Sequence, residues 1–188
     1  MLSKAEIREQ MRAALAGILP AERDECSQRI VAAAMALPAW REACVVMCFV
    51  SMPSEVQTAE LFRRGWADGK TMLAPHVDWA ANVMAGVRLD SLERLKIGKF
   101  GVVELPAGPA ADPASIDLLF APAMAFDAEG YRLGRGGGYF DRFCSQNGFR
   151  AAIVGLGFDC QRVDRLPRDG HDVPVDVLVT ESGAIRFR

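Results

Sequence analysis

Four glycines stand within five consecutive positions: Gly134, Gly136, Gly137 and Gly138. Glycine lets the backbone approach a ligand without a Cβ in the way, and successive N–H groups in such a loop can converge on phosphate oxygens. Arg132 and Arg135 could donate charge-assisted hydrogen bonds to the same oxygens. Asp141 falls in the first turn of the helix expected next, where its carboxylate could hold a Mg²⁺ ion that bridges phosphates. These residue types in this order predict a nucleotide-phosphate and metal site.

A flexible surface turn is the alternative interpretation of the same segment. Its arginines would then be solvated, and Asp141 would only compensate the dipole of the helix that follows. Glycine content alone does not separate the two interpretations. The combination of glycines, arginines and an aspartate just past a buried strand favours the functional one.

Two cations near the N-terminus could add positive charge to such a site. The pattern predicts a helix over residues 3–19, with Ser3 and Glu6 as a capping box. On a helical wheel, Lys4 and Arg8 fall on or beside the apolar face and not on the charged face opposite. Their long stems could simply extend from the edge of the core into solvent. The functional alternative is that both cations point into a cleft that holds an anion.

The elements that must position these residues alternate between helices and strands. Helices are expected at 21–37, at 54–67 with Ser54 as the cap, and from the glycines through Phe143. Mostly apolar strands are expected at 43–50, 70–75, 82–89, 118–122, 151–158, 175–181 and 184–188. This alternation predicts a single-domain α/β fold over residues 1–188, with three layers and a largely parallel (mixed) sheet flanked by helices. Ligands of such sheets bind beyond the carboxyl ends of the strands, which is where the glycines are expected.

Composition excludes several classes of protein. The 22 basic and 24 acidic residues nearly cancel, whereas nucleic-acid-binding proteins usually show a basic excess. No apolar run approaches the roughly 20 residues that span a bilayer, and the charged N-terminus does not read as a signal peptide. The five cysteines form no CxxC pair, which fits free thiols in a reducing compartment. We therefore expect a cytoplasmic protein with small-molecule ligands and no nucleic-acid or membrane partner, as a monomer or weak dimer.

The stretch from Phe120 to Phe143, FAPAMAFDAEGYRLGRGGGYFDRF, resembles the signature of the 5-formyltetrahydrofolate cyclo-ligases, also called methenyltetrahydrofolate synthetases. Further similar segments are KAEIR near the start, SMPSEVQT at 51–58, GKTMLAP at 69–75 and HDVPVDVLVTE at 171–181. The resemblance therefore covers essentially the whole chain. It implies an α/β sheet fold and a ligase that uses ATP and Mg²⁺. That ligase would convert 5-formyltetrahydrofolate to 5,10-methenyltetrahydrofolate, with ADP and phosphate as products.

The resemblance also implies roles for individual residues. The implied ATP contacts are Lys4, Arg8, Arg132, Gly134, Arg135, Gly136, Gly137, Gly138 and Tyr139. Arg135 and Tyr139 are the implied catalytic residues, and Asp141 and Asp176 the implied metal ligands. The implied folate contacts are Met52, Glu55, Phe100 and Tyr139.

Three positions depart from the family pattern and keep other hypotheses open. Gly137 stands where some members carry lysine, Phe140 replaces the second tyrosine of a common Tyr-Tyr pair, and Leu105 separates a glutamate from a proline that are often adjacent. A non-catalytic relative that binds folate or nucleotide is therefore a second hypothesis. A third is a sugar-phosphate isomerase or acyl-CoA enzyme on a similar sheet, which would need no ATP.

Overall fold

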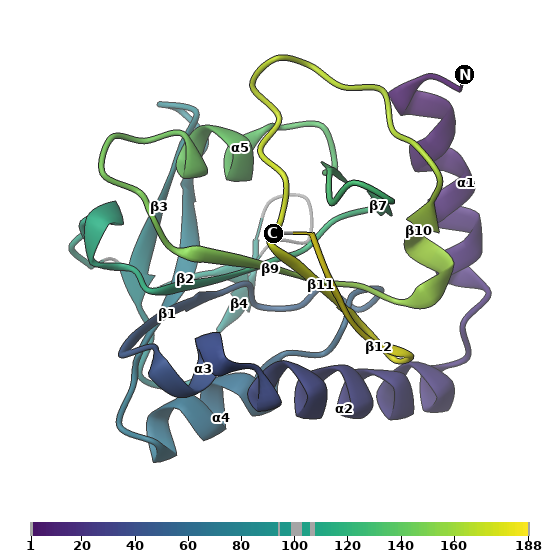
Figure 1. The fold of residues 1–188 in the computed structure, drawn as a ribbon. Coiled ribbons are helices and arrows are strands. Elements are labelled where there is room, and N and C mark those ends of the chain that lie inside the picture. Colours follow the sequence, from purple (N-terminus) through teal and green to yellow (C-terminus); the bar gives the residue numbers. More distant parts are fainter. Residues whose placement is uncertain (1, 94, 99–102, 106–107, 188) are drawn as a thin grey trace.

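The computed structural model describes residues 2–93, 95–98, 103–105 and 108–187, and Figure 1 shows its fold. A seven-stranded sheet runs in the order β12-β11-β9-β6-β1-β2-β3. Its strands are β1 Val45–Cys48, β2 Thr71–Asp78, β3 Val83–Arg88, β6 Leu118–Ala121, β9 Ala152–Leu156, β11 Val177–Thr180 and β12 Gly183–Arg186. The five central strands are parallel, and β12 and β3 pair antiparallel at the two edges. The predicted α/β fold with a largely parallel sheet is confirmed.

Helices cover the sheet on both sides. They are α1 Lys4–Ala16, α2 Pro20–Ala36, α3 Pro38–Glu42, α4 Ala59–Ala67 and α5 Tyr139–Cys144. In Figure 1, α2, α3 and α4 lie together below the sheet, α5 lies above it, and α1 stands beside it. No helix of the described part of the chain is long and apolar enough to cross a membrane.

Short elements complete the fold. In a small three-stranded sheet, β7 Ala125–Asp127 lies between β10 Arg162–Val163 and β8 Arg132–Leu133. A two-stranded ribbon joins β4 Lys96–Ile97 to β5 Val103–Glu104. Two 3₁₀ turns are η2 Pro113–Ser115 and η3 Asp159–Gln161.

The central strands form because their side chains are apolar on both faces. Val46 and Cys48 belong to the core on one face of the sheet, while Met47, one residue along, belongs to the core on the other. Met47 pairs in register with Leu119, and both are fully buried. Each such side chain contributes about 1.5–3 kcal/mol by leaving water. This two-sided burial is why the runs contain almost no polar residues.

The N-terminal helix begins as predicted. The Ser3 hydroxyl accepts from the Glu6 N–H at 3.3 Å, and the Ser3 N–H donates to the Glu6 carboxylate at 2.8 Å. Pro20 is the first residue of α2, where a missing N–H costs nothing. α1 itself ends earlier, at Ala16.

The helix expected from Ser54 is wrong at its start, because α4 begins only at Ala59. Side chains hold residues 51–58 as a loop instead. The Ser51 hydroxyl donates to the Val56 carbonyl at 2.7 Å and accepts from the Thr58 N–H at 2.8 Å. These contacts compete with helical hydrogen bonds, as short polar side chains often do. The loop follows the carboxyl end of β1 and carries Glu55.

Candidate functional site

The glycine loop, residues 134–138, connects β8 to α5. Gly136 and Gly138 have φ angles of 118° and 64°, in the left-handed region where a Cβ is strained. Gly138 is also the N-cap residue of α5. The first four residues of the loop are exposed. The predicted loop is therefore built on backbone conformations that require glycine.

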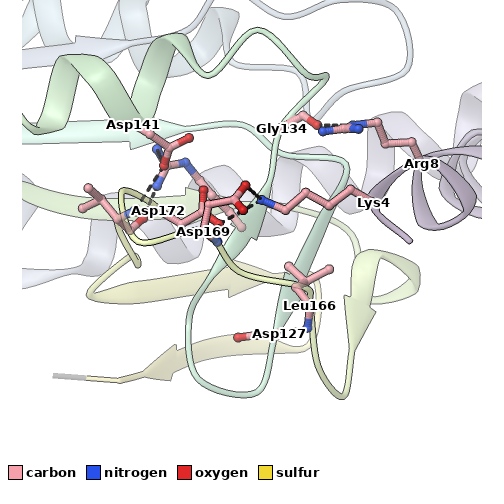
Figure 2. A network of polar contacts seen from close by, with 10 residues as sticks. Lys4, Arg8, Asp127, Gly134, Asp141, Leu166, Asp169 and Asp172 are labelled. Atoms are coloured by element: carbon pink, nitrogen blue, oxygen red, sulfur yellow. Dashed lines mark hydrogen bonds and ion pairs between the residues drawn. The ribbon is translucent and has the colours of Figure 1, made fainter. Parts of the chain in front are cut away.

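Arg8 lies against the glycine loop although it is 126 positions away in the sequence. Its Nε donates to the Gly134 carbonyl at 2.8 Å, and Figure 2 shows its side chain reaching from α1 to that loop. A Cβ added to Gly136 would lie 3.8 Å from the Arg8 guanidinium. The structure therefore brings Arg8, one of the two helix cations considered above, into contact with the glycine loop.

Lys4 reaches a different segment, the loop between β10 and β11. Its Nζ contacts the carboxylates of Asp169 at 2.8 Å and Asp172 at 3.0 Å (Figure 2). Partial burial lowers the pKa of Lys4, but the hydrogen bonds to these two carboxylates outweigh it, so the net pKa is raised. Lys4 therefore stays charged and ties α1 to this loop, and its expected phosphate contact stays a prediction.

Arg132, another expected phosphate contact, is buried beside Asp141. Its side chain is 2% exposed, and its Nη2 lies 3.0 Å from Oδ1 of Asp141 in an ion pair that lacks the geometry of a hydrogen bond. It also donates to the Val173 carbonyl. The observed partner of this enclosed guanidinium is therefore Asp141, and the expected phosphate contact of Arg132 stays a prediction.

Both carboxylates expected to bind a metal influence the pKa of the Cys144 thiol. Burial, with smaller contributions from the charges of Asp141 and Asp176, raises the pKa of Cys144 to about 11, against a lowering by Arg132. Asp141 is 16% exposed and also accepts from the Val173 N–H at 3.2 Å, again through Oδ1. Neither contact of Asp141 with the described residues uses its Oδ2.

Asp176 has a structural contact as well. Its Oδ2 accepts from the Ile153 N–H at 2.7 Å, where β11 and β9 begin. Asp117 makes the equivalent contact where β6 and β1 begin, accepting from the N–H groups of Cys44 and Val45 at 2.8 Å each. An aspartate before a strand thus caps the start of its parallel neighbour twice in this sheet.

Arg135 and Glu55 form an ion pair that joins the glycine loop to the loop after β1. Nη2 of Arg135 lies 2.9 Å and its Nε 3.2 Å from Oε1 of Glu55. Oε2 of Glu55 accepts from the Met52 N–H at 2.9 Å. The residues expected on the nucleotide side and on the folate side therefore meet in one place. Phe100, the other expected folate contact, lies outside the described residues.

Tyr139 explains why the loop carries glycine at position 137. The Tyr139 ring packs edge-on against Trp79, with centroids 5.6 Å apart. A Cβ on Gly137 would lie 2.6 Å from that ring, so a lysine there would displace it. Phe140 is partly buried and packs against the apolar cores on both faces of the sheet.

Sequence reasoning missed Arg142, which supplies the cation nearest the end of the glycine loop. Its Nη1 donates to the Gly137 carbonyl at 2.8 Å, and its guanidinium lies 4.8 Å from the Tyr139 ring centroid. Its Nη2 donates to Oδ1 of Asn82 at 3.1 Å, in the turn between β2 and β3. The sequence spacing of Tyr139 and Arg142 could have identified this contact, because residues three apart lie on the same face of a helix.

Comparison with known proteins matches residues 1–181 to the model of the 5-formyltetrahydrofolate cyclo-ligase family. The chain is 30% identical over 181 residues to the 5-formyltetrahydrofolate cyclo-ligase of Escherichia coli, covering 94% of this chain and 97% of that one. It is 29% identical over 189 residues to the Mus musculus enzyme of the same name, covering 95% and 91%.

Solved structures agree with this match. The 5,10-methenyltetrahydrofolate synthetase of Aquifex aeolicus superposes with a TM-score of 0.84 at 33% identity, covering 98% of this chain and 93% of that one. The Mycoplasma pneumoniae protein of that name, at 20% identity, shares the fold with a TM-score of 0.79 over 96% and 99% of the two chains. The matched range of residues 1–181 contains the glycine loop, Arg8, Glu55 and Asp141. The chain belongs to the 5-formyltetrahydrofolate cyclo-ligase family.

Proposed function

We propose that this chain converts 5-formyltetrahydrofolate to 5,10-methenyltetrahydrofolate with ATP, releasing ADP and phosphate. The observation that carries the proposal to this chain is the ion pair between Arg135 and Glu55. It brings the loop suited to phosphate and the carboxylate suited to a pterin within contact distance. A single site can therefore hold both substrates with the γ-phosphoryl group near the folate.

The chemistry explains why such a site needs no acidic nucleophile. A formamide carbon is a poor electrophile, and its oxygen is a poor leaving group. Transfer of the γ-phosphoryl group to the formyl oxygen releases ADP and turns that oxygen into a leaving group. N10 of the folate then bonds to the formyl carbon and loses its proton, and the C–O bond breaks as phosphate departs. Phosphoryl transfer asks a protein mainly for positioning and charge stabilisation.

The residues around the loop can supply both. The loop backbone and Arg8 would hold the nucleotide phosphates, because Arg8 already lies against Gly134. Arg135, between the loop and Glu55, would stabilise the charge on the transferring group. Glu55 would accept the paired N–H donors of the pterin ring. Tyr139 would line the site from the start of α5.

The carboxylates also fit a metal ion. Asp141 is partly exposed, is held by Arg132 and the Val173 N–H through Oδ1 alone, and offers the hard oxygen donor that Mg²⁺ prefers. Asp176, whose charge, like that of Asp141, raises the pKa of the Cys144 thiol, is the proposed second carboxylate. Bound there, Mg²⁺ would neutralise phosphate charge. The five free thiols fit a cytoplasmic enzyme, which we propose acts as a monomer or weak dimer.

A turnover assay tests this proposal. Protein mixed with 5-formyltetrahydrofolate, ATP and Mg²⁺ should form the methenyl product, followed by its absorbance, with one ADP per product. Folate binding without turnover would instead indicate a non-catalytic carrier. Turnover of a phosphate ester or acyl-CoA without any ATP requirement would indicate the isomerase or acyl-CoA hypothesis.

Arg8→Ala should raise the KM for ATP about tenfold, because one charge-assisted contact to phosphate is lost. The KM for folate should change less than twofold. Steady-state kinetics in both substrates measures the split. Arg12→Ala is the matched control, since Arg12 lies one turn further along α1 with a 60% exposed side chain. An ATP KM that stays unchanged in Arg8→Ala would remove Arg8 from the site.

Arg142→Ala should lower kcat about tenfold, because the Gly137 carbonyl and the turn at Asn82 lose the side chain that holds them together. Arg142→Lys keeps the charge but cannot bridge both contacts, so it should recover only part of the rate. The exposed Arg150 provides the control variant, Arg150→Ala. An unchanged kcat in Arg142→Ala would mean that the loop is positioned without it.

A further inference from the structure

Glu55 is fully engaged within the protein. Oε1 faces two donors of Arg135, and Oε2 accepts from the Met52 N–H. Its side chain is only 13% exposed, so there is little room for additional partners beside these. Paired N–H donors of a pterin ring need both carboxylate oxygens on one edge. Binding of the pterin therefore competes directly with Arg135.

The hydrogen-bond donors of Arg135 that could bind phosphate are also engaged within the protein. The edge formed by its Nε and Nη2 faces Glu55, and this edge is one of the forks through which arginine binds two oxygens of a phosphate. Its side chain is 44% exposed, so it can leave Glu55 without disturbing the core. Because Arg135 is the more exposed partner and Glu55 is nearly enclosed, we expect Arg135 to be the side chain that moves.

We propose that Arg135 and Glu55 couple the binding of the two substrates. The pterin takes over Glu55, Arg135 is released toward the γ-phosphoryl group, and each substrate tightens the binding of the other. The pterin donors are neutral, so released Arg135 gains its new counter-charge from phosphate. Coupling between binding sites is reciprocal, so nucleotide tightens folate by the same factor. This inference rests on the proposed function of the site.

The coupling also has a consequence for ATP hydrolysis. Until a folate occupies Glu55, Arg135 stays engaged by the Glu55 carboxylate and is not free to stabilise the transferring phosphoryl group. Transfer of the γ-phosphoryl group to water would therefore be slow while the folate side is unoccupied, because Arg135 does not stabilise it. The ion pair thus protects ATP when the formyl acceptor is absent.

Calorimetry with Mg²⁺ and the non-hydrolysable analogue AMP-PNP tests the coupling. In the unmodified protein, saturating 5-formyltetrahydrofolate should lower the Kd for AMP-PNP about fivefold, the range of a partly exposed ion pair. Glu55→Gln should bind AMP-PNP about fivefold more tightly than the unmodified protein with no folate present. Glu60→Gln is the matched control, because Glu60 is 60% exposed and pairs with Arg63 on α4.

A second variant approaches the ion pair from the other side. Arg135→Gln should bind 5-formyltetrahydrofolate about fivefold more tightly than the unmodified protein when no nucleotide is present. Unchanged AMP-PNP affinity in Glu55→Gln, or equal AMP-PNP affinity with and without folate in a protein that turns over, would overturn the coupling and leave the proposed function intact. Absence of both turnover and folate binding would overturn the proposed function, and the coupling with it.

Discussion

Arg135→Ala is expected to lower kcat/KM for ATP about 100-fold at saturating folate, the effect of removing one donor that stabilises developing charge. We expect this large effect because Arg135 belongs to the glycine loop and its side chain contacts Glu55, the expected folate contact. Folate binding should not fall with it, since Glu55 keeps both oxygens and loses a competitor. Steady-state kinetics for ATP and equilibrium binding of 5-formyltetrahydrofolate measure the two effects separately.

The control for this variant is Arg63→Ala, which removes an arginine with a 63% exposed side chain on α4. Its kinetics should match the unmodified enzyme within about twofold, as expected for an exposed helix charge. Equal losses in ATP use and folate binding on replacing Arg135 would count against the assignment. Such a result would mean that the side chain only holds the loops together.

Asp141→Asn is expected to have two effects at once. The concentration of Mg²⁺ needed for half-maximal rate should rise at least about tenfold, because the amide is a weaker metal ligand than the carboxylate. The free energy of unfolding should fall by about 3 kcal/mol, because Arg132 is left as an uncompensated buried charge. Metal titration of the rate and urea denaturation check the two expectations independently.

The comparison variant is Asp68→Asn, which breaks the exposed ion pair between Arg64 and Asp68 on α4. Its free energy of unfolding should change by less than about 1 kcal/mol. A normal metal requirement in Asp141→Asn would exclude Asp141 as a ligand. Unchanged stability would show that Arg132 does not depend on this carboxylate.

The strands were predictable because their burial is two-sided. Leu118, Leu119 and Phe120 are consecutive and fully buried, a pattern that a one-sided strand does not produce. The end of α4 was also visible, since Gly69 has the positive φ of a helix terminus. The start of α4 could not be predicted. Ser51 forms hydrogen bonds to Val56 and Thr58 that keep this segment a loop, and helix propensity does not reflect such side-chain contacts.

The site was predictable in part, from the types of residue and from the family resemblance. The wheel position of Arg8 left open whether its side chain reaches solvent or an anion cleft, and the structure puts the side chain against the glycine loop. Burial of Arg132 could not be foreseen, because it depends on the Val173 segment, 41 positions away, closing over it. The contact of Arg135 with Glu55, 80 positions apart, likewise follows from tertiary structure alone.

The central claim is that ATP activates the formyl oxygen of 5-formyltetrahydrofolate in this site. Substrate labelled with ¹⁸O in the formyl group tests it most directly, with the inorganic phosphate analysed by mass spectrometry after turnover with ATP and Mg²⁺. We expect methenyl product, one ADP per product, and one labelled oxygen in each phosphate. Product formed without ADP, or phosphate that carries no label, would contradict the account.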